Sequence, residues 1–194
     1  SLVTDALLIK ASSAQVGLFQ VTLSADAGET LSSMAVTINA ANASTTVSGS
    51  DLASISIYKD DGNGVFNPAT DALVGTQSAV NVGSLTTIVP SATTTASGKF
   101  FVSLATSASW ADTAPADAIT VTFPANGIVT SAGTLALPAA VTTNTITADT
   151  TSPQLLSAIA KNTGGTSAKE AGDSVELTFS ESTSKPAVTS SNIG

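Results

Sequence analysis

Apolar and polar residues alternate at every second position in several parts of this chain, and this pattern constrains its fold most. Ile119, Val121 and Phe123 alternate with threonines, and Met34 and Val36 alternate within residues 31–40. A period of two places one set of side chains on a single face of an extended strand. No stretch has a convincing helical period. The sequence therefore predicts an all-β fold.

Segments of this kind recur at short intervals, separated by glycine-rich and polar turns. Such spacing is typical of a β-sandwich. A polar loop is expected at 39–51, and 119–123 is expected to close the first sandwich. Strands are predicted at residues 6–11, 17–25, 31–40, 79–82, 85–89, 98–105, 119–123, 155–160 and 174–179, with a further strand around Ile55 and Ile57.

A domain boundary is expected within residues 142–153, TTNTITADTTSP. Small polar residues followed by a proline are typical of a linker or of a strand that opens the next domain. We therefore predict one sandwich over residues 1–148 and a partial second one over 149–194. A piece of about 45 residues is too small to bury a sandwich core by itself.

Composition excludes several classes of partner. The net charge is −8, and the chain has six lysines and no arginine, which argues against nucleic acid because phosphates are bound largely through Lys and Arg. Its apolar runs are far too short to insert into a membrane. Hydrophobic residues make up 42 %, too many for a disordered chain. Because the sequence opens at Ser1 and not at Met, we expect a mature or excised segment.

The residue types that are missing argue against catalysis. The chain has no histidine and no cysteine, so the usual Ser–His and Cys–His nucleophile pairs cannot form. A carboxylate pair could hydrolyse glycosides, but the acidic residues cluster in a turn and not around an aromatic cleft. We expect a non-enzymatic protein. The absence of cysteine removes disulfides from the argument, although a secreted domain can hold together without them if a metal supplies the staple.

The stretch YKDDGNGVFNPATDALVG, residues 58–75, is the strongest candidate for such a metal site. It crowds acidic and amide side chains around two glycines. Calcium prefers six to eight oxygens from carboxylates, amides, carbonyls and water, and glycine permits the sharp turns that aim carbonyls inward. We predict a Ca²⁺ site formed by Asp60, Asp61, Asn63, the carbonyl of Val65, Asn67 and Asp71.

The spacing fits a standard calcium loop only in part. Such a loop supplies ligands at positions 1, 3, 5, 7, 9 and 12. Counting from Asp60 places Asp71 at position 12 but puts glycines at positions 3 and 5, whereas alignment on Asp61 and Asn63 leaves Asp71 one residue late. The simpler alternative is a polar hairpin turn without metal, since Asp, Asn and Gly are also the usual turn residues.

Two stretches together carry a family resemblance. IYKDDGNGVFNPATDALVG, and the later DTTSPQLLSAIA with EAGDSVELTFSE, resemble parts of bacterial and archaeal cell-surface proteins built from immunoglobulin-like repeats, including S-layer proteins and adhesins. The resemblance covers residues 17–126 and 149–181. Its motifs are shared by many exported modules of differing roles.

This resemblance implies an immunoglobulin-like β-sandwich followed by the start of a second, incomplete one. It also implies an extracellular structural module, stabilised by calcium, whose partners are neighbouring domains or other copies in a surface array. Where this chain has Asn63 and Asn67, the family often has Asp, so we expect a weaker site here. An affinity of about 10⁻⁴ to 10⁻³ M suffices outside the cell.

Other candidates are weaker, and each has a simpler interpretation. Asn42 begins a glycosylation sequon that can arise by chance in a chain with 58 Ser and Thr. Trp110 could stack on a glycan but more often such a residue covers the end of a core. Asp149, Glu170 and Asp173 could hold a second ion, although solvated turn carboxylates are the preferred interpretation. A carbohydrate-binding module and a subunit completed by a strand from another chain remain alternatives.

Overall fold

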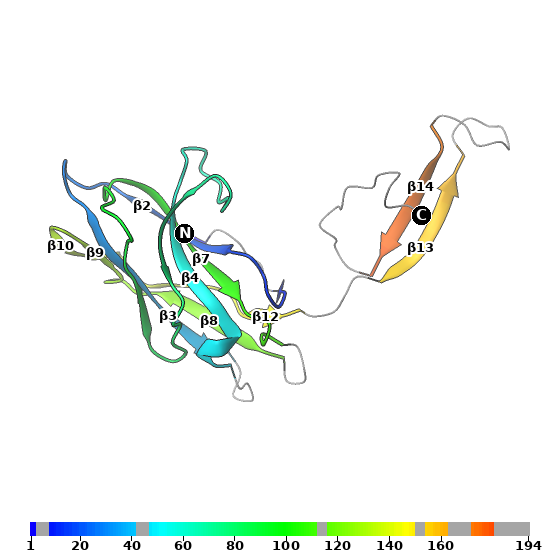
Figure 1. Cartoon of the computed structure of the whole chain (residues 1–194), viewed down its shortest axis with the longest axis horizontal. Coiled ribbons are helices and arrows are strands. Elements are labelled where there is room, and N and C mark those ends of the chain that lie inside the picture. The colour runs from blue at the N-terminus through cyan, green and yellow to red at the C-terminus, as the bar shows by residue number, and fades with distance from the viewer. Residues whose placement is uncertain (3–7, 42–46, 112–115, 150–153, 163–171, 181–194) are drawn as a thin grey trace. The chain divides into compact units, whose positions relative to one another are not determined.

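The computed structural model of the chain describes residues 1–2, 8–41, 47–111, 116–149, 154–162 and 172–180. It divides into two compact units, Ser1–Thr150 and Thr151–Gly194 (Figure 1). The one helical element among the described residues is the short 3₁₀ turn Gly49–Asp51. The prediction of an all-β fold is therefore confirmed.

The first sheet of unit 1 has four antiparallel strands in the order β2-β7-β4-β5. Its central strand, β7, is buried along almost its whole length. Next to it, β4 carries Ile55 and Ile57, the pair that indicated a strand. The strands are β2 (Val16–Leu23), β4 (Leu52–Lys59), β5 (Ala72–Gln77) and β7 (Gly98–Thr106).

The second sheet of unit 1 is organised around β3 (Leu31–Ala40). β6 pairs with the middle of β3, while β9 and β8 pair with successive parts of it. Beyond them lie β10, which pairs with β9, and β11 and β12, which pair with β8; β1 joins β12 in parallel. These strands are β1 (Leu8–Ile9), β6 (Leu85–Ile88), β8 (Ala118–Phe123), β9 (Ile128–Thr130), β10 (Gly133–Leu135), β11 (Val141–Thr142) and β12 (Ile146–Ala148).

The core of unit 1 lies between these two sheets, as expected for a β-sandwich (Figure 1). The rings of Phe19 and Phe123, one from each sheet, meet edge to face with centroids 5.7 Å apart. The residues that alternate in the sequence supply the fully buried side chains, so the periodic pattern correctly identified the core face. Examples with no exposed surface are Met34, Val36, Ile38, Ile55, Ile57, Val102, Ile119 and Val121.

One prediction about the end of unit 1 was wrong. Residues 119–123 do form a strand, but they do not close the sandwich, because β9 to β12 follow and extend the same sheet. Within the expected boundary region 142–153, Ile146–Ala148 still pairs with β8 inside unit 1, and the two units divide after Thr150. These late strands have only two or three residues each, too few to show a period.

Three further differences concern connections. Residues 79–82 form no strand; Val82 makes only an isolated parallel bridge to Ile38. The polar segment 39–51 is not all loop, because β3 continues to Ala40 and a 3₁₀ turn occupies Gly49–Asp51. β5 was not predicted as a strand. Its adjacent residues Leu73 and Val74 lie on opposite faces of the sheet, since Val74 is buried whereas Leu73 is 55 % exposed.

Trp110 closes one end of the core. Its side chain is fully buried, and its Nε1–H donates a hydrogen bond of 2.9 Å to the carbonyl oxygen of Ile9. An indole buried in this way satisfies its polar group and fills a large volume. The interpretation of Trp110 as a core cover is confirmed, and the indole is not available to stack on a glycan.

Unit 2 is described as a single antiparallel hairpin of β13 (Leu155–Lys161) and β14 (Ser174–Phe179), which confirms both predicted strands. Lys161 and Glu176 form a salt bridge of 2.6 Å. Leu156, Val175 and Leu177 are all largely exposed. A two-stranded sheet is at best marginally stable in water, so this hairpin needs further structure to cover its apolar residues.

We predict that Trp110→Phe destabilises unit 1. The change removes one of two donors to the buried Ile9 carbonyl, which keeps the N–H of Asp149 at 3.0 Å, and leaves a small cavity. Together these losses should lower the free energy of unfolding by about 1 to 3 kcal/mol. Melts followed by circular dichroism measure it, because the variant has no tryptophan fluorescence. Leu85→Ala is the control: Leu85 is 53 % exposed, and its loss should cost only about 0.5 kcal/mol. Equal losses in the two variants would contradict the assignment.

Candidate metal centre

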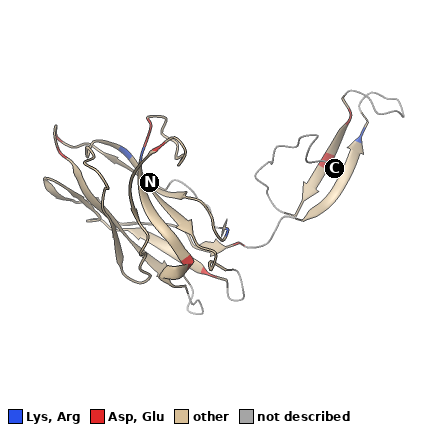
Figure 2. Cartoon of the chain, viewed as in Figure 1, with Lys and Arg blue, Asp and Glu red and all other residues tan. Residues whose placement is uncertain are grey.

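The acidic stretch forms the loop between β4 and β5, and Figure 2 shows its acidic residues together at this turn. Lys59 pairs directly with Ala72 at the base of the hairpin. Asp60 and Asp71 are the next residues on either side, so strand pairing brings together two carboxylates that are eleven positions apart in sequence. Their proximity follows from the hairpin and does not depend on the register of a standard calcium loop.

Asp61 joins these two residues to form a cluster of three carboxylates. One oxygen from each of Asp60, Asp61 and Asp71 lies within 4.8 Å of the others. Asp71 is buried, Asp60 is half-buried and Asp61 is exposed. It is the one group of its kind among the residues that the structure describes. Three negative charges at this separation repel one another unless a positive charge lies among them.

Backbone N–H groups hold two of the carboxylates in place. Asp71 accepts from the N–H of Asp61 at 3.1 Å and from the N–H of Asn67 at 2.8 Å. Asp60 accepts from the N–H of Gly64 at 3.0 and 3.2 Å. Gly64 has a φ of 79°, a left-handed conformation that favours glycine. The backbone of the loop therefore surrounds the carboxylates of Asp60 and Asp71 and holds them by hydrogen bonds.

The amide side chains of Asn63 and Asn67 cap turns within the loop. The Asn63 Oδ1 accepts from the N–H of Val65 at 2.6 Å, and its Nδ2 donates to Asp61 at 3.1 Å. The Asn67 Oδ1 accepts from the N–H of Ala69 at 3.0 Å. Of the six predicted ligands, the structure thus brings Asp60, Asp61 and Asp71 together as a cluster. The roles of Asn63, Asn67 and the Val65 carbonyl as ligands stay predictions.

The donor set fits a hard divalent cation. An ionised carboxylate has about four lone-pair sites on its two oxygens, so the hydrogen bonds described above leave each carboxylate able to bind an ion as well. Carboxylate oxygens suit calcium and magnesium, whereas transition metals would favour the imidazole and thiolate groups that this chain lacks. A cation held there would offset the mutual repulsion of Asp60, Asp61 and Asp71.

Phe66 fixes the loop onto the outer face of the first sheet. Its ring meets those of Tyr58 and Phe101 edge to face, with centroid distances of 5.4 and 5.5 Å. Tyr58 and Phe101 pair directly across β4 and β7 and are 7 % and 1 % exposed. Sequence reasoning missed this contact, although a lone phenylalanine among polar turn residues was the available signal.

Two lysines lie near the loop, and sequence reasoning did not single them out. An added Cβ at Gly64 would lie 2.8 Å from the Lys99 Nζ, so this ammonium group rests against the loop. The Lys59 Nζ instead donates to Thr95 at 2.8 Å and lies over the ring of Phe100. The one salt bridge in the described part of the chain is Lys161–Glu176, so neither lysine is paired directly with the three carboxylates.

The other predicted sites have different outcomes. Asn42 and Glu170 lie outside the described residues. Asp149 belongs to unit 1 and Asp173 to unit 2, and the second ion at the junction stays a prediction. Tyr58, like Trp110, is buried. Neither Trp110, the residue considered for glycan stacking, nor Tyr58 therefore presents an open ring face.

Comparison with known proteins identifies no relative: no family model matches this chain, and neither does any curated protein. Among the described residues, no helix is long and apolar enough to span a membrane. The functional assignment therefore depends on the site and the fold.

We predict that Phe66→Ala loosens the loop even without metal. The change uncovers the rings of Tyr58 and Phe101 and should lower the free energy of unfolding by about 1 to 3 kcal/mol, measured by melts in chelator. Val65→Ala is a matched control, because Val65 is the adjacent residue and is 67 % exposed; its effect should stay within about 0.5 kcal/mol. If both variants melted alike, Phe66 would not anchor the loop.

We also predict a stability change at high pH from Tyr58, the only tyrosine in the chain. Burial disfavours the phenolate and raises the pKa of Tyr58 above its usual value of 10.0. As pH rises, the unfolded chain therefore loses this proton before the folded chain does. The contribution of Tyr58 to the free energy of unfolding is fully present below about pH 10 and is lost as pH rises through the pKa of the folded state. Phenolate absorbance in the ultraviolet measures the titration. A native-state midpoint no higher than that of the unfolded chain would contradict this prediction.

Proposed function

We propose that this chain is a structural module of an extracellular cell-surface protein, of the S-layer or adhesin type, stabilised by Ca²⁺ at the β4–β5 loop. The observation that carries the proposal is the cluster of Asp60, Asp61 and Asp71 at the base of a hairpin loop. A cation there would join both ends of the loop to its exposed part. It would stabilise the folded state by an amount that grows with the logarithm of the calcium concentration once this exceeds the dissociation constant.

The strand order supports an immunoglobulin-like form of the sandwich. Immunoglobulin domains place strands B, E and D side by side in one sheet and C, F and G in the other. Here the first sheet contains β2, β7 and β4 as neighbours, and the second contains β3, β8 and β12 as neighbours. Their sequence order matches B, D, E and C, F, G, with β5 and β6 inserted between D and E and β9 to β11 inserted between F and G.

Composition and the second unit support a role in a surface array. A module with 58 Ser and Thr, no cysteine and few charges resembles exported repeat modules. The β13–β14 hairpin begins after the DTTSP stretch that resembles the opening of such a repeat. Partners would be neighbouring domains or other copies of the module. No residue cluster described in the structure favours catalysis over this role.

The exposed hairpin also supports one alternative, a subunit whose second unit is completed by another chain. Leu156, Ile159 and Val175 are each more than half exposed, and an added strand or sheet would cover them. A glycan-binding module has less support, because the buried Trp110 and Tyr58 offer no platform. Concentration-dependent oligomers would favour completion by another chain.

Thermal unfolding in calcium tests the proposal directly. Calcium at about ten times its dissociation constant should add about 1.4 kcal/mol, which raises the midpoint of unit 1 by about 3 to 6 °C. Magnesium should add less, because it demands a near-ideal octahedral set of ligands and gives up water reluctantly. The full chain is used, and Trp110 fluorescence reports on unit 1 alone.

Asp61→Asn is the informative variant. Asp61 is exposed and accepts only from Asn63, so its amide analogue keeps the turn but removes a charge. Asp71 is less suitable, because its carboxylate also holds two backbone N–H groups. Asp26→Asn, in the β2–β3 turn, controls for the loss of one charge. Calcium should raise the unfolding midpoint of the Asp26→Asn variant as much as that of the unchanged chain, and that of the Asp61→Asn variant much less. If calcium shifted no midpoint, the loop would be a turn without metal.

A further inference from the structure

Among the residues that the structure describes, the outer edge of β2 is paired at Phe19 and Gln20, in the middle of the strand. Ser1 and Gln20 exchange two backbone hydrogen bonds, of 2.9 and 2.8 Å, and Leu2 lies opposite Phe19 in an antiparallel bridge. In an antiparallel ladder, successive residues turn their N–H and C=O groups to opposite sides. Since Gln20 faces this edge, Thr22 faces it too. The backbone groups of Thr22 thus lie where the ladder that Ser1 and Leu2 begin would continue along β2.

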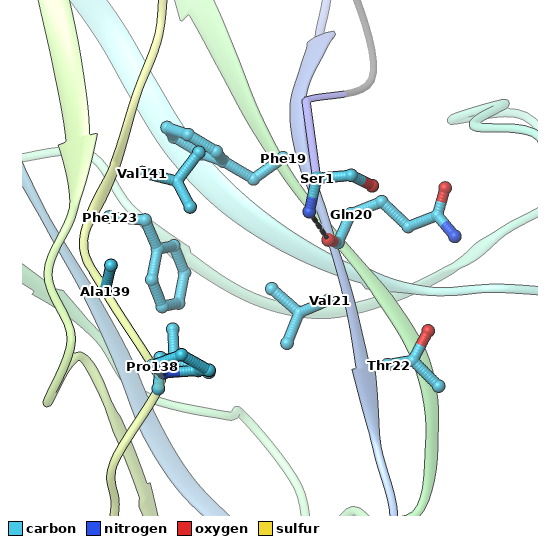
Figure 3. A pocket seen from close by; sticks show the side chains of 10 residues that line it. Ser1, Phe19, Gln20, Val21, Thr22, Phe123, Pro138, Ala139 and Val141 are labelled. Atoms are coloured by element: carbon cyan, nitrogen blue, oxygen red, sulfur yellow. Dashed lines mark hydrogen bonds between the residues drawn. The ribbon is translucent and has the colours of Figure 1, made fainter.

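An apolar pocket of about 230 Å³ lies beside this edge, at the side of the sandwich (Figure 3). Figure 3 shows Phe19 and Val21 of β2 facing Phe123 and Val141 of the second sheet, while the side chains of Gln20 and Thr22 point away. Val21 and Val141 are only half-buried. The pocket is several times the roughly 30 Å³ share of one water molecule, so it has room for an aliphatic side chain.

We infer that this edge and pocket form a docking site for an extended segment joined to the amino group of Ser1, which continues the existing ladder along β2. The Ser1 nitrogen already donates to the Gln20 carbonyl. An amide nitrogen at that position keeps one N–H and can make the same bond. The segment would place its backbone against Thr22 and one side chain in the pocket.

The established register fixes which side chain enters. Leu2 lies opposite Phe19 and Ser1 opposite Gln20, so a residue bonded to Ser1 would lie opposite Val21. Residues directly opposite in a sheet share a face, and Val21 faces the pocket. The next residue outward would face solvent beside Thr22, and the one after it would face inward beside Leu23. The site therefore selects an alternating segment with an apolar residue next to Ser1.

Two N-terminal extensions of identical composition test this register. Thr-Val-Thr-Val placed before Ser1 puts valines opposite Val21 and Leu23, whereas Val-Thr-Val-Thr puts threonines there. The first should raise the midpoint of unit 1, followed by Trp110 fluorescence, by about 2 to 4 °C, and the second should leave it unchanged. In a Val21→Thr background, which makes the pocket less apolar, the gain from the first extension should shrink.

Each other outcome overturns the inference. Equal stabilisation by both extensions would mean that added chain length, and not the pocket, is responsible. No stabilisation by either would mean that β2 does not accept further residues. If acetylated Thr-Val-Thr-Val added free to the unextended chain stabilised it while the fused segment did not, the site would bind a separate peptide and not a continuation of this chain.

Discussion

The burial of β7 on both of its faces is the constraint on which the rest of unit 1 depends. On the inner face, Phe100, Val102 and Leu104 fill the core between the sheets, and on the outer face Phe101 lies beneath Phe66. Ser103, also on the outer face, is buried and donates to the side chain of Gln15 at 2.7 Å. A strand covered in this way links the core to the acidic loop through adjacent residues.

The acidic loop combines rigid anchoring with three closely spaced carboxylates that form no salt bridge among the described residues. Phe66 and the backbone hydrogen bonds hold Asp60 and Asp71 in place, so their carboxylates cannot move apart freely to reduce repulsion. Ordinary polar turns avoid this cost by leaving carboxylates in solvent, and here Asp71 is buried. A hard cation would reduce the repulsion while keeping the packing, and the proposed structural role of the loop rests on this argument.

The two units differ in how they satisfy their apolar residues. Unit 1 has two sheets facing each other and buries residues such as Met34, Ile57 and Val121 completely. The described part of unit 2 is one sheet of two strands with Val175 and Leu177 exposed. A sheet gains most of its stability from the layer packed on it, and the two strands described in unit 2 have no such layer among the described residues.

The sequence by itself determined the all-β class, the longer strands and the acidic loop, because period-two alternation and clustered turn residues are local signals. It also indicated that Trp110 covers the core. Tertiary structure decided the rest. The short strands β9, β11 and β12 exist because β3 and β8 offer edges for them, and β10 in turn pairs with β9. No local pattern encodes such pairing. The loop's three carboxylates meet because β4 and β5 pair, and Phe66 acquires its role because Tyr58 and Phe101 come together from separate strands. Contacts between residues far apart in sequence depend on how sheets align, and that alignment is set by the packing of the whole core.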